Sequence, residues 1–217
     1  MLKQLFDAIR RNDVAQVDKL VDAEPGLLAQ RDDAGMSAIS LSAYMENAPL
    51  TTHLRSKRGK PDFFEAIIVG DLAAVRDELA RGRDVNEFAP DGFPPLGLAV
   101  FFRQPEIARL LLDAGAVVNA QSKNALRVSA MSAAVARGDI AMVEQLLYRG
   151  ADPNIMQQRM FRPIHEAAMA GSGAAVALLL MFGADPAALS EEGKRAADYA
   201  RSKGHTALAR QLDVLAK

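Results

Sequence analysis

Apolar residues along this chain follow a pattern that recurs about every 33 residues. Each repeat holds two short segments whose apolar residues lie three and four positions apart, and in three repeats the second segment closes on Leu-Leu-x-x-Gly-Ala. This ending is found within 106–119, 142–154 and 176–185. Apolar residues at that spacing form one buried stripe on an α-helix. The pattern therefore predicts helical hairpins that stack into a solenoid, each burying its apolar side against its neighbours.

One apolar anchor residue in the first helix of each repeat sets the number of units. The anchors are Leu5, Ile39, Phe63, Leu96, Met131, Ile164 and Ala197, and three positions after them come Ala8, Ser42, Ala66, Ala99, Ala134, Ala167 and Ala200. Small residues are required there, because larger side chains would wedge closely stacked helices apart. We predict a single all-α domain over 1–217, with polar terminal faces. Its seven units are 1–30, 31–58, 59–88, 89–121, 122–157, 158–190 and 191–217, each bound being approximate.

One interval between anchors is shorter than the rest. Ile39 and Phe63 are 24 residues apart, whereas the other intervals are 33 to 35 residues. About nine residues are missing around 55–61, which is the length of the loop that normally joins two hairpins. We expect a direct helix-to-helix link with a local kink. The alternative is a pair of sub-arrays, 1–58 and 59–217, that meet less tightly.

These repeats resemble a known family. The segment 162–168, Arg-Pro-Ile-His-Glu-Ala-Ala, is similar to the Thr-Pro-Leu-His-x-Ala-Ala signature of ankyrin repeats, and RGADPN at 149–154 and AGAVVN at 114–119 extend the resemblance over nearly the whole chain. The resemblance implies an ankyrin-repeat fold, and it implies that the signature histidine, His165, hydrogen-bonds between neighbouring loops. The other units lack this histidine, so we expect them to be less regular. The family is defined by its scaffold and binds unrelated partners, so the resemblance says little about the ligand.

Composition removes several classes of function. The formal net charge of −1 gives no electrostatic case for binding nucleic acid or an anionic membrane, and the absence of cysteine excludes disulfides and thiolate chemistry. The N-terminal segment 1–17 carries charges throughout, unlike a signal peptide, and no apolar run is long enough for a membrane span. We expect a cytoplasmic protein, with a secreted effector as the alternative. Its richness in Ala, Arg and Leu suggests a bacterial origin.

The sequence offers no catalytic motif that the repeat pattern leaves unexplained. Of the three histidines, His165 belongs to the signature, His205 lies in a turn between helices, and His53 is expected to be solvated. His165-Glu166 begins like a zinc-protease motif, but Met169 stands where the second ligand would be. The basic run 55–60 has no interleaved aromatic residue, so we interpret it as a solvated connector rather than a phosphate site or acidic-partner patch. We predict no enzyme, no cofactor and no metal; the alternative is a hydrolase that depends on His165.

Large apolar side chains occupy positions that an ankyrin-like array leaves free of packing. These positions are the hairpin tips and the ends of the first helices, which line the concave side. Exposed apolar and aromatic residues on a protein surface usually mark an interaction site. We predict a partner-binding surface made of Tyr44, Met45, Phe93, Phe101, Phe102, Leu126, Arg137, Arg159, Phe161 and Met169. For Tyr44 and Met45, and for the neighbouring Ile68 and Val69, packing in the core is the favoured alternative.

Within this surface, Phe93, Phe101 and Phe102 belong to one unit and should converge into an anchor. Arginines, among them Arg137 and Arg159, should rim the surface and pair with carboxylates of the partner. We therefore predict a monomer that binds a protein or peptide through its concave face and hairpin tips and inhibits or sequesters it, as an immunity or effector protein would. The alternative is a structural protein that self-associates through the same surface.

Overall fold

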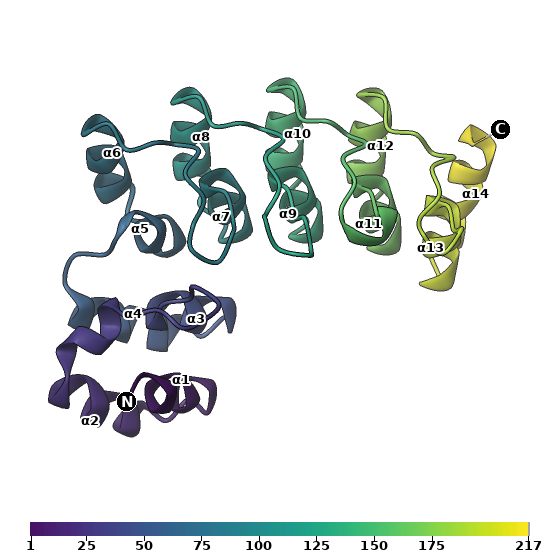
Figure 1. Cartoon of the computed structure of the whole chain (residues 1–217). Helices are drawn as coiled ribbons and strands as arrows, with labels where there is room; N and C mark the ends of the chain where they lie inside the picture. Colours follow the sequence, from purple (N-terminus) through teal and green to yellow (C-terminus); the bar gives the residue numbers. More distant parts are fainter. Residues whose placement is uncertain (217) are drawn as a thin grey trace. The chain divides into compact units, whose positions relative to one another are not determined.

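The computed structural model describes residues 1–216, and these form helical hairpins (Figure 1). Within that range there are fourteen α-helices, two short 3-10 helices and two isolated β-bridges, but no β-strand. The helices pair into seven hairpins, which confirms the predicted all-α solenoid of helix-turn-helix units. The chain divides into two compact units, Met1–Ala114 and the residues from Gly115 onward.

The first unit contains four hairpins. Their first helices, α1, α3, α5 and α7, contact one another in chain order. The elements are α1 (Leu2–Arg10), α2 (Val14–Ala23), η1 (Pro25–Ala29), α3 (Ala38–Tyr44), α4 (Ala48–Arg58), α5 (Phe63–Val69), α6 (Leu72–Ala80), α7 (Pro95–Phe101) and α8 (Pro105–Asp113).

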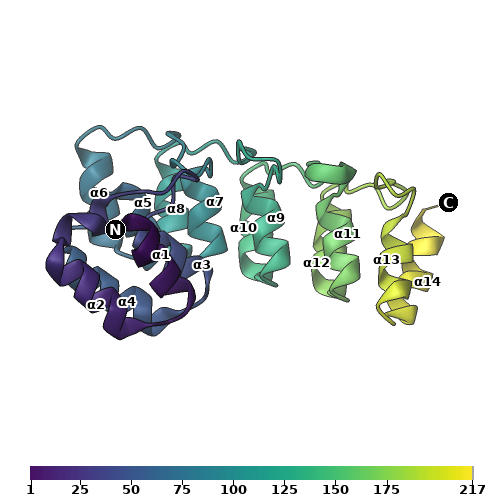
Figure 2. The ribbon, with the colours of Figure 1, turned by 60° about the horizontal axis from the view of Figure 1, so that its bottom comes forward.

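The second unit contains three hairpins in two layers. First helices α9, α11 and α13 form one layer and second helices α10, α12 and α14 the other, while the loops that join successive hairpins lie at one end of the helices (Figures 1 and 2). The elements are α9 (Ala130–Ala136), α10 (Ile140–Tyr148), η2 (Gln158–Met160), α11 (Pro163–Met169), α12 (Gly173–Met181), α13 (Ala196–Ser202) and α14 (Thr206–Leu215).

The core follows the repeat pattern. The seven anchor residues are at most 3% exposed, and the seven small residues that follow them are 0% exposed. The small side chains therefore do face neighbouring helices, as close stacking requires. Both sets of assignments are confirmed.

Each hairpin turns where the sequence places a residue suited to the left-handed conformation. Gly70 ends α5 at φ 76°, and the next residue, Asp71, accepts a hydrogen bond from the Ala74 N–H at the start of α6. Asn12 adopts the same left-handed conformation after α1, at φ 54°, and the next residue, Asp13, caps α2. An αL residue followed by a capping carboxylate ends one helix and begins the next without leaving backbone groups unpaired.

The short interval between the second and third hairpins is a direct helix-to-helix link, as predicted. Helix α4 ends at Arg58 and α5 begins at Phe63, so residues 59–62 alone join them. Asp62 accepts hydrogen bonds from the N–H groups of Phe64 and Glu65, and the Glu65 side chain accepts from the Asp62 N–H, which completes a capping box. The link lies inside the first unit.

The link also brings together two hairpins that are not consecutive. Gly35, in the tip before α3, has φ +78°, and a Cβ built on it would overlap the carbonyl of Pro90 and lie 2.8 Å from the Asp91 nitrogen. Pro90 and Asp91 belong to the tip before α7. The second and fourth hairpins of the first unit therefore touch at their tips, past the third.

We expect Gly35→Ala to destabilise the protein by about 2–4 kcal/mol, because the new methyl group must displace the Pro90 backbone and also sits at positive φ. Gly193→Ala is the matched control, since Gly193 has the same place in its own hairpin, φ +70°, and open space around its Cβ. That control should cost only about 1–2 kcal/mol for the backbone conformation. Urea unfolding followed by circular dichroism measures both; equal losses would show that the two tips do not touch.

Candidate functional site

Three phenylalanine rings of the first unit surround Tyr44, the last residue of α3, so that four aromatic side chains meet. Its ring centroid lies 6.1 Å from that of Phe93, 5.7 Å from Phe101 and 5.0 Å from Phe102. The last two rings pack edge to face, 5.1 Å apart. The predicted convergence of the three phenylalanines on one point is thus present, and a tyrosine from another hairpin stands at its centre. We call these four residues the aromatic cluster.

The aromatic cluster is half-buried. Of the four residues for which core packing was the alternative, some are buried and others are exposed. Met45, directly after Tyr44, is 41% exposed, so packing in the core is wrong for this residue. Ile68 is buried, and Val69 packs against the core of the first two hairpins, as expected. Tyr44 packs against the phenylalanines rather than into that core, because the tips of the second and fourth hairpins meet beside it.

One hydrogen bond fixes the polar end of Tyr44. Its hydroxyl donates to Asp91 Oδ2 at 3.3 Å, and the same carboxylate accepts the Phe93 N–H through Oδ1 at 3.3 Å. Burial, reinforced by the Asp91 charge, raises the pKa of Tyr44, and burial also raises the pKa of Asp91. Tyr44 therefore stays protonated at neutral pH and acts as a donor. The aromatic cluster is consequently a rigid apolar surface with one hydrogen-bonded edge.

The other five predicted residues lie in the second unit. Leu126, in the tip before α9, is 45% exposed, while Phe161, Met169 and Arg137 are half-buried. The Phe161 ring packs 5.2 Å from both His165 and Tyr199.

Arg159 is already paired with carboxylates of its own chain. Its Nη2 lies 2.9 Å from Glu192 and its Nε 3.6 Å from Glu191. Arg162, a second arginine near this tip, donates to the carbonyl of Leu189 at 3.1 Å. These guanidinium groups connect the tip before α11 to the tip before α13. They are therefore less available to the carboxylates of a partner than unpaired arginines would be.

Glu166 is an acid that the repeat pattern did not predict as a binding residue. It is half-buried on α11, burial alone raises its pKa, and among residues 1–216 its carboxylate has no hydrogen-bonding or ion-pair partner. Its position four residues after Arg162 suggests an ordinary helical ion pair. That pair is not formed, because the Arg162 guanidinium is engaged at Leu189.

His165 has the structural role that the resemblance implies. It is fully buried; its Nδ1 accepts from the Arg162 N–H at 3.1 Å, so Nε2 carries the proton and donates to the Ala188 carbonyl in the next loop at 3.0 Å. Burial lowers the pKa of His165, which keeps the ring neutral. With both nitrogens occupied, it has no free position for acid–base chemistry.

His53 is not simply solvated, as the sequence suggested. Its Nε2 lies 2.6 Å from Asp18 Oδ1 on α2, and this contact, more than the Asp18–Lys57 pair, lowers the pKa of Asp18. The prediction was wrong because α4 brings His53 against the preceding hairpin.

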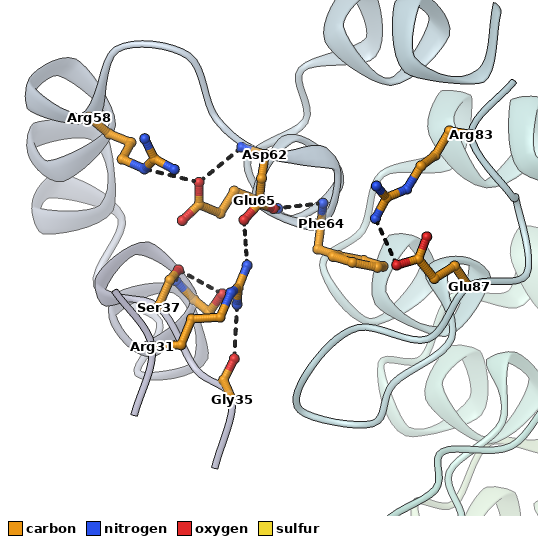
Figure 3. A network of polar contacts seen from close by, with 10 residues as sticks. Arg31, Gly35, Ser37, Arg58, Asp62, Phe64, Glu65, Arg83 and Glu87 are labelled. Carbon is orange, nitrogen blue, oxygen red and sulfur yellow. Dashed lines mark hydrogen bonds and ion pairs between the residues drawn. The ribbon is translucent and has the colours of Figure 1, made fainter. Parts of the chain in front are cut away.

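The basic run 55–60 also binds the protein's own carboxylates. Arg55 lies 2.8 Å from Asp71, Lys57 2.8 Å from Asp22, Arg58 3.5 Å from Glu65 and Lys60 3.4 Å from Glu78. Figure 3 shows Arg58 reaching the buried Glu65 and Arg31 bridging Asp62 and the Gly35 carbonyl. The run is therefore partly exposed, as a solvated connector would be, and its charges form ion pairs with acids of the same unit.

Arg31, Arg58, Lys60 and Arg83 line an open recess of about 480 Å³ at this link. Each of the four has a carboxylate partner: Asp62, Glu65, Glu78 and Glu87. Charges therefore balance in the recess, and it offers little attraction to a phosphate or an acidic partner.

Residues 1–216 lack the features of two further classes of site. No group of three or more potential metal-ligating side chains comes together there. No helix in the same stretch combines the length and the apolar character needed to cross a bilayer.

Comparison with known proteins agrees with the repeat architecture. Residues 53–155 and 130–213 match the family described as ankyrin repeats (3 copies). The ankyrin repeat, SAM and basic leucine zipper domain-containing protein 1 of Dasypus novemcinctus is 33% identical over 148 residues, which cover 65% of this chain and 31% of that protein. The proteins of the same name from Microcebus murinus and Colobus guereza are 36% identical over 121 residues and 34% identical over 122 residues, each match covering 54% of this chain and 25% of the relative. The chain thus spans less than a third of the length of these relatives.

We expect Glu166→Gln to raise the thermal midpoint at pH 7 by about 1–2 °C, the shift that about half a kcal/mol gives a domain of this size. The reason is that ionised Glu166 is half-buried without a partner. Folding raises the pKa of Glu166, so the folded protein resists ionisation of this carboxyl group. Below the ordinary pKa of 4.5 the group is protonated in both states and does not destabilise the fold. The destabilisation develops as pH rises from that value to the folded pKa. The gain should therefore shrink toward zero at pH 3.5.

Glu144→Gln serves as the control, since Glu144 is exposed on α10 of the same unit and should give no such gain. Calorimetry of both variants at the two pH values decides the matter. A Glu166→Gln protein that is less stable at pH 7, or equally favoured at both pH values, would contradict the assignment.

Proposed function

The chain belongs to the ankyrin repeat family, and from this we propose that it is a non-catalytic module that binds a partner protein or peptide. Ankyrin repeats generally serve protein–protein interaction and are typically without catalytic activity. We propose the concave face and the hairpin tips as the surface used, with the partner inhibited or sequestered by being covered.

The observation that carries this proposal is the aromatic cluster together with exposed Met45. Aromatic residues and methionine are the types enriched at the cores of interfaces, and a few such anchors supply most of the binding energy. The rings are already fixed by mutual packing and by the Tyr44–Asp91 hydrogen bond. A partner that covers their remaining exposed surface therefore loses little affinity to ordering of this side.

Charge supports a protein partner over nucleic acid. The formal net charge is −1, and the most basic segment is neutralised by acids of the same chain. Nucleic-acid binding draws its affinity from unpaired cations that replace counterions at phosphates. We propose that the protein acts as a cytoplasmic monomer. From composition and family analogy we also propose a bacterial origin and an immunity- or effector-like role, while the named relatives are mammalian.

We expect Met45→Glu to weaken recovery of the partner from native lysate about tenfold, because it places an uncompensated charge beside the aromatic cluster. The double variant Phe101→Asp, Phe102→Asp should abolish recovery. Met181→Glu is the matched control: Met181 is 73% exposed on α12, away from the predicted residues, and the variant should bind as the wild type does. Circular dichroism confirms that each variant keeps its helices.

Light scattering on the same samples separates the alternatives. Partner binding predicts a mass that does not change with concentration, whereas self-association predicts a mass that rises with concentration and falls back in the double variant. A partner retained at full strength by folded Met45→Glu and by the double variant would refute the proposed surface.

A further inference from the structure

A small recess in the second unit contains the unpaired Glu166. It has a volume of about 250 Å³ and lies between the tip before α11 and the first turn of α13, with Gln157, Phe161, Glu166, Glu192 and Tyr199 in its lining. Sites for drug-sized ligands and cofactors are usually larger, roughly 300–1,000 Å³. The recess therefore suits a single side chain.

The walls of the recess are held in place before any ligand arrives. The rings of Phe161 and Tyr199 pack edge to face at 5.2 Å, and both contact His165, whose two nitrogens are bonded. The Tyr199 hydroxyl donates to Ser190 Oγ at 2.9 Å. The ring faces are therefore presented by a fixed frame.

The charges of the recess leave one carboxylate without a counterion. Arg159 and Lys194 are paired with Glu191 and Glu192, and Glu166 remains. Lys194 Nζ also lies 5.8 Å from the centroid of the Tyr199 ring, so this ring already takes part in one cation–π contact. A carboxylate, aromatic rings and glutamine amides together match a guanidinium, which needs several acceptors and stacks on rings.

We infer that this recess receives an arginine side chain of the partner, with its guanidinium paired to Glu166 and lying against Tyr199 and Phe161. The inference rests on the proposed function and adds that the partner carries an arginine where it meets this recess. The sequence had placed arginines on this side and carboxylates on the partner. In the recess the pairing is reversed, because the arginines are bound within the chain and the carboxylate is not.

The probe is the peptide acetyl-Gly-Arg-Gly-amide, titrated into the whole chain and followed through the backbone amide signals of Phe161, Glu166 and Tyr199 by NMR. We expect saturable shifts with a dissociation constant on the order of millimolar, as one side chain allows. The same peptide with citrulline, which keeps the shape and lacks the charge, should give no saturable shift, and its lysine counterpart should bind several-fold more weakly.

Glu166→Gln should weaken arginine binding at least tenfold, whereas Glu144→Gln should leave it unchanged. Glu166→Gln is expected to fold at least as well as the wild type, so loss of binding cannot be ascribed to unfolding. Equal binding of the citrulline peptide, or full binding to folded Glu166→Gln, would overturn the inference.

This result is separable from the test of the proposed function. The aromatic cluster lies in the first unit and the recess in the second. A protein that loses its partner in the Phe101→Asp, Phe102→Asp variant but never binds arginine refutes only the recess. A protein that binds the arginine peptide through Glu166 but recovers its partner equally in all variants refutes only the aromatic surface.

Discussion

Close stacking of the first helices is the constraint on which the rest of this structure depends. Within each unit the first helices contact one another, and each of them carries a small side chain that is completely buried, with a buried apolar anchor residue three positions before it. Such contacts fill space at crystal-like density and leave no room for variation. Chemical variety is consequently greatest at the tips, the helix ends and the outer helices. Every binding residue predicted from the sequence lies at a tip or a helix end.

The shortened link between α4 and α5 modifies this regular scheme in the first unit. In a regular array each hairpin contacts only its immediate neighbours. Here the lost loop lets the tip that carries Gly35 reach Pro90, and Tyr44 reach the phenylalanines of the fourth hairpin. The same link is held by Arg58 against Glu65, a carboxylate only 1% exposed that would be costly to bury without its partner and its capping role. The first unit thus combines a short link held by ion pairs with contacts between its second and fourth hairpins, where the candidate binding surface lies.

Features that depend on contacts within one repeat, or between two adjacent repeats, could be predicted from the sequence. The anchors, the small residues, the left-handed turns at Asn12 and Gly70, the direct link and the bond of His165 to the next loop all follow from local spacing. Convergence of Phe93, Phe101 and Phe102 belongs to this class too. The position of Tyr44 could not be predicted, because its contacts come from a hairpin two places along the chain. For Met45, core packing was the favoured alternative to the predicted binding surface because its residue type favours burial, whereas its place at the end of α3 leaves it in solvent.

Charged residues were the least predictable, because spacing gives several partners for one charge and geometry selects among them. Arg162 could pair with Glu166 by helical spacing, yet a backbone carbonyl at Leu189 takes its guanidinium. The basic run 55–60 looked free because its acids are distant in sequence, on α2, α5 and α6. An apparent excess of one charge in a sequence therefore says little about the charge a partner must carry. What matters is which group stays unpaired after folding, and on α11 that group is a carboxylate between aromatic rings, which favours a cationic partner even though arginines surround it in the sequence.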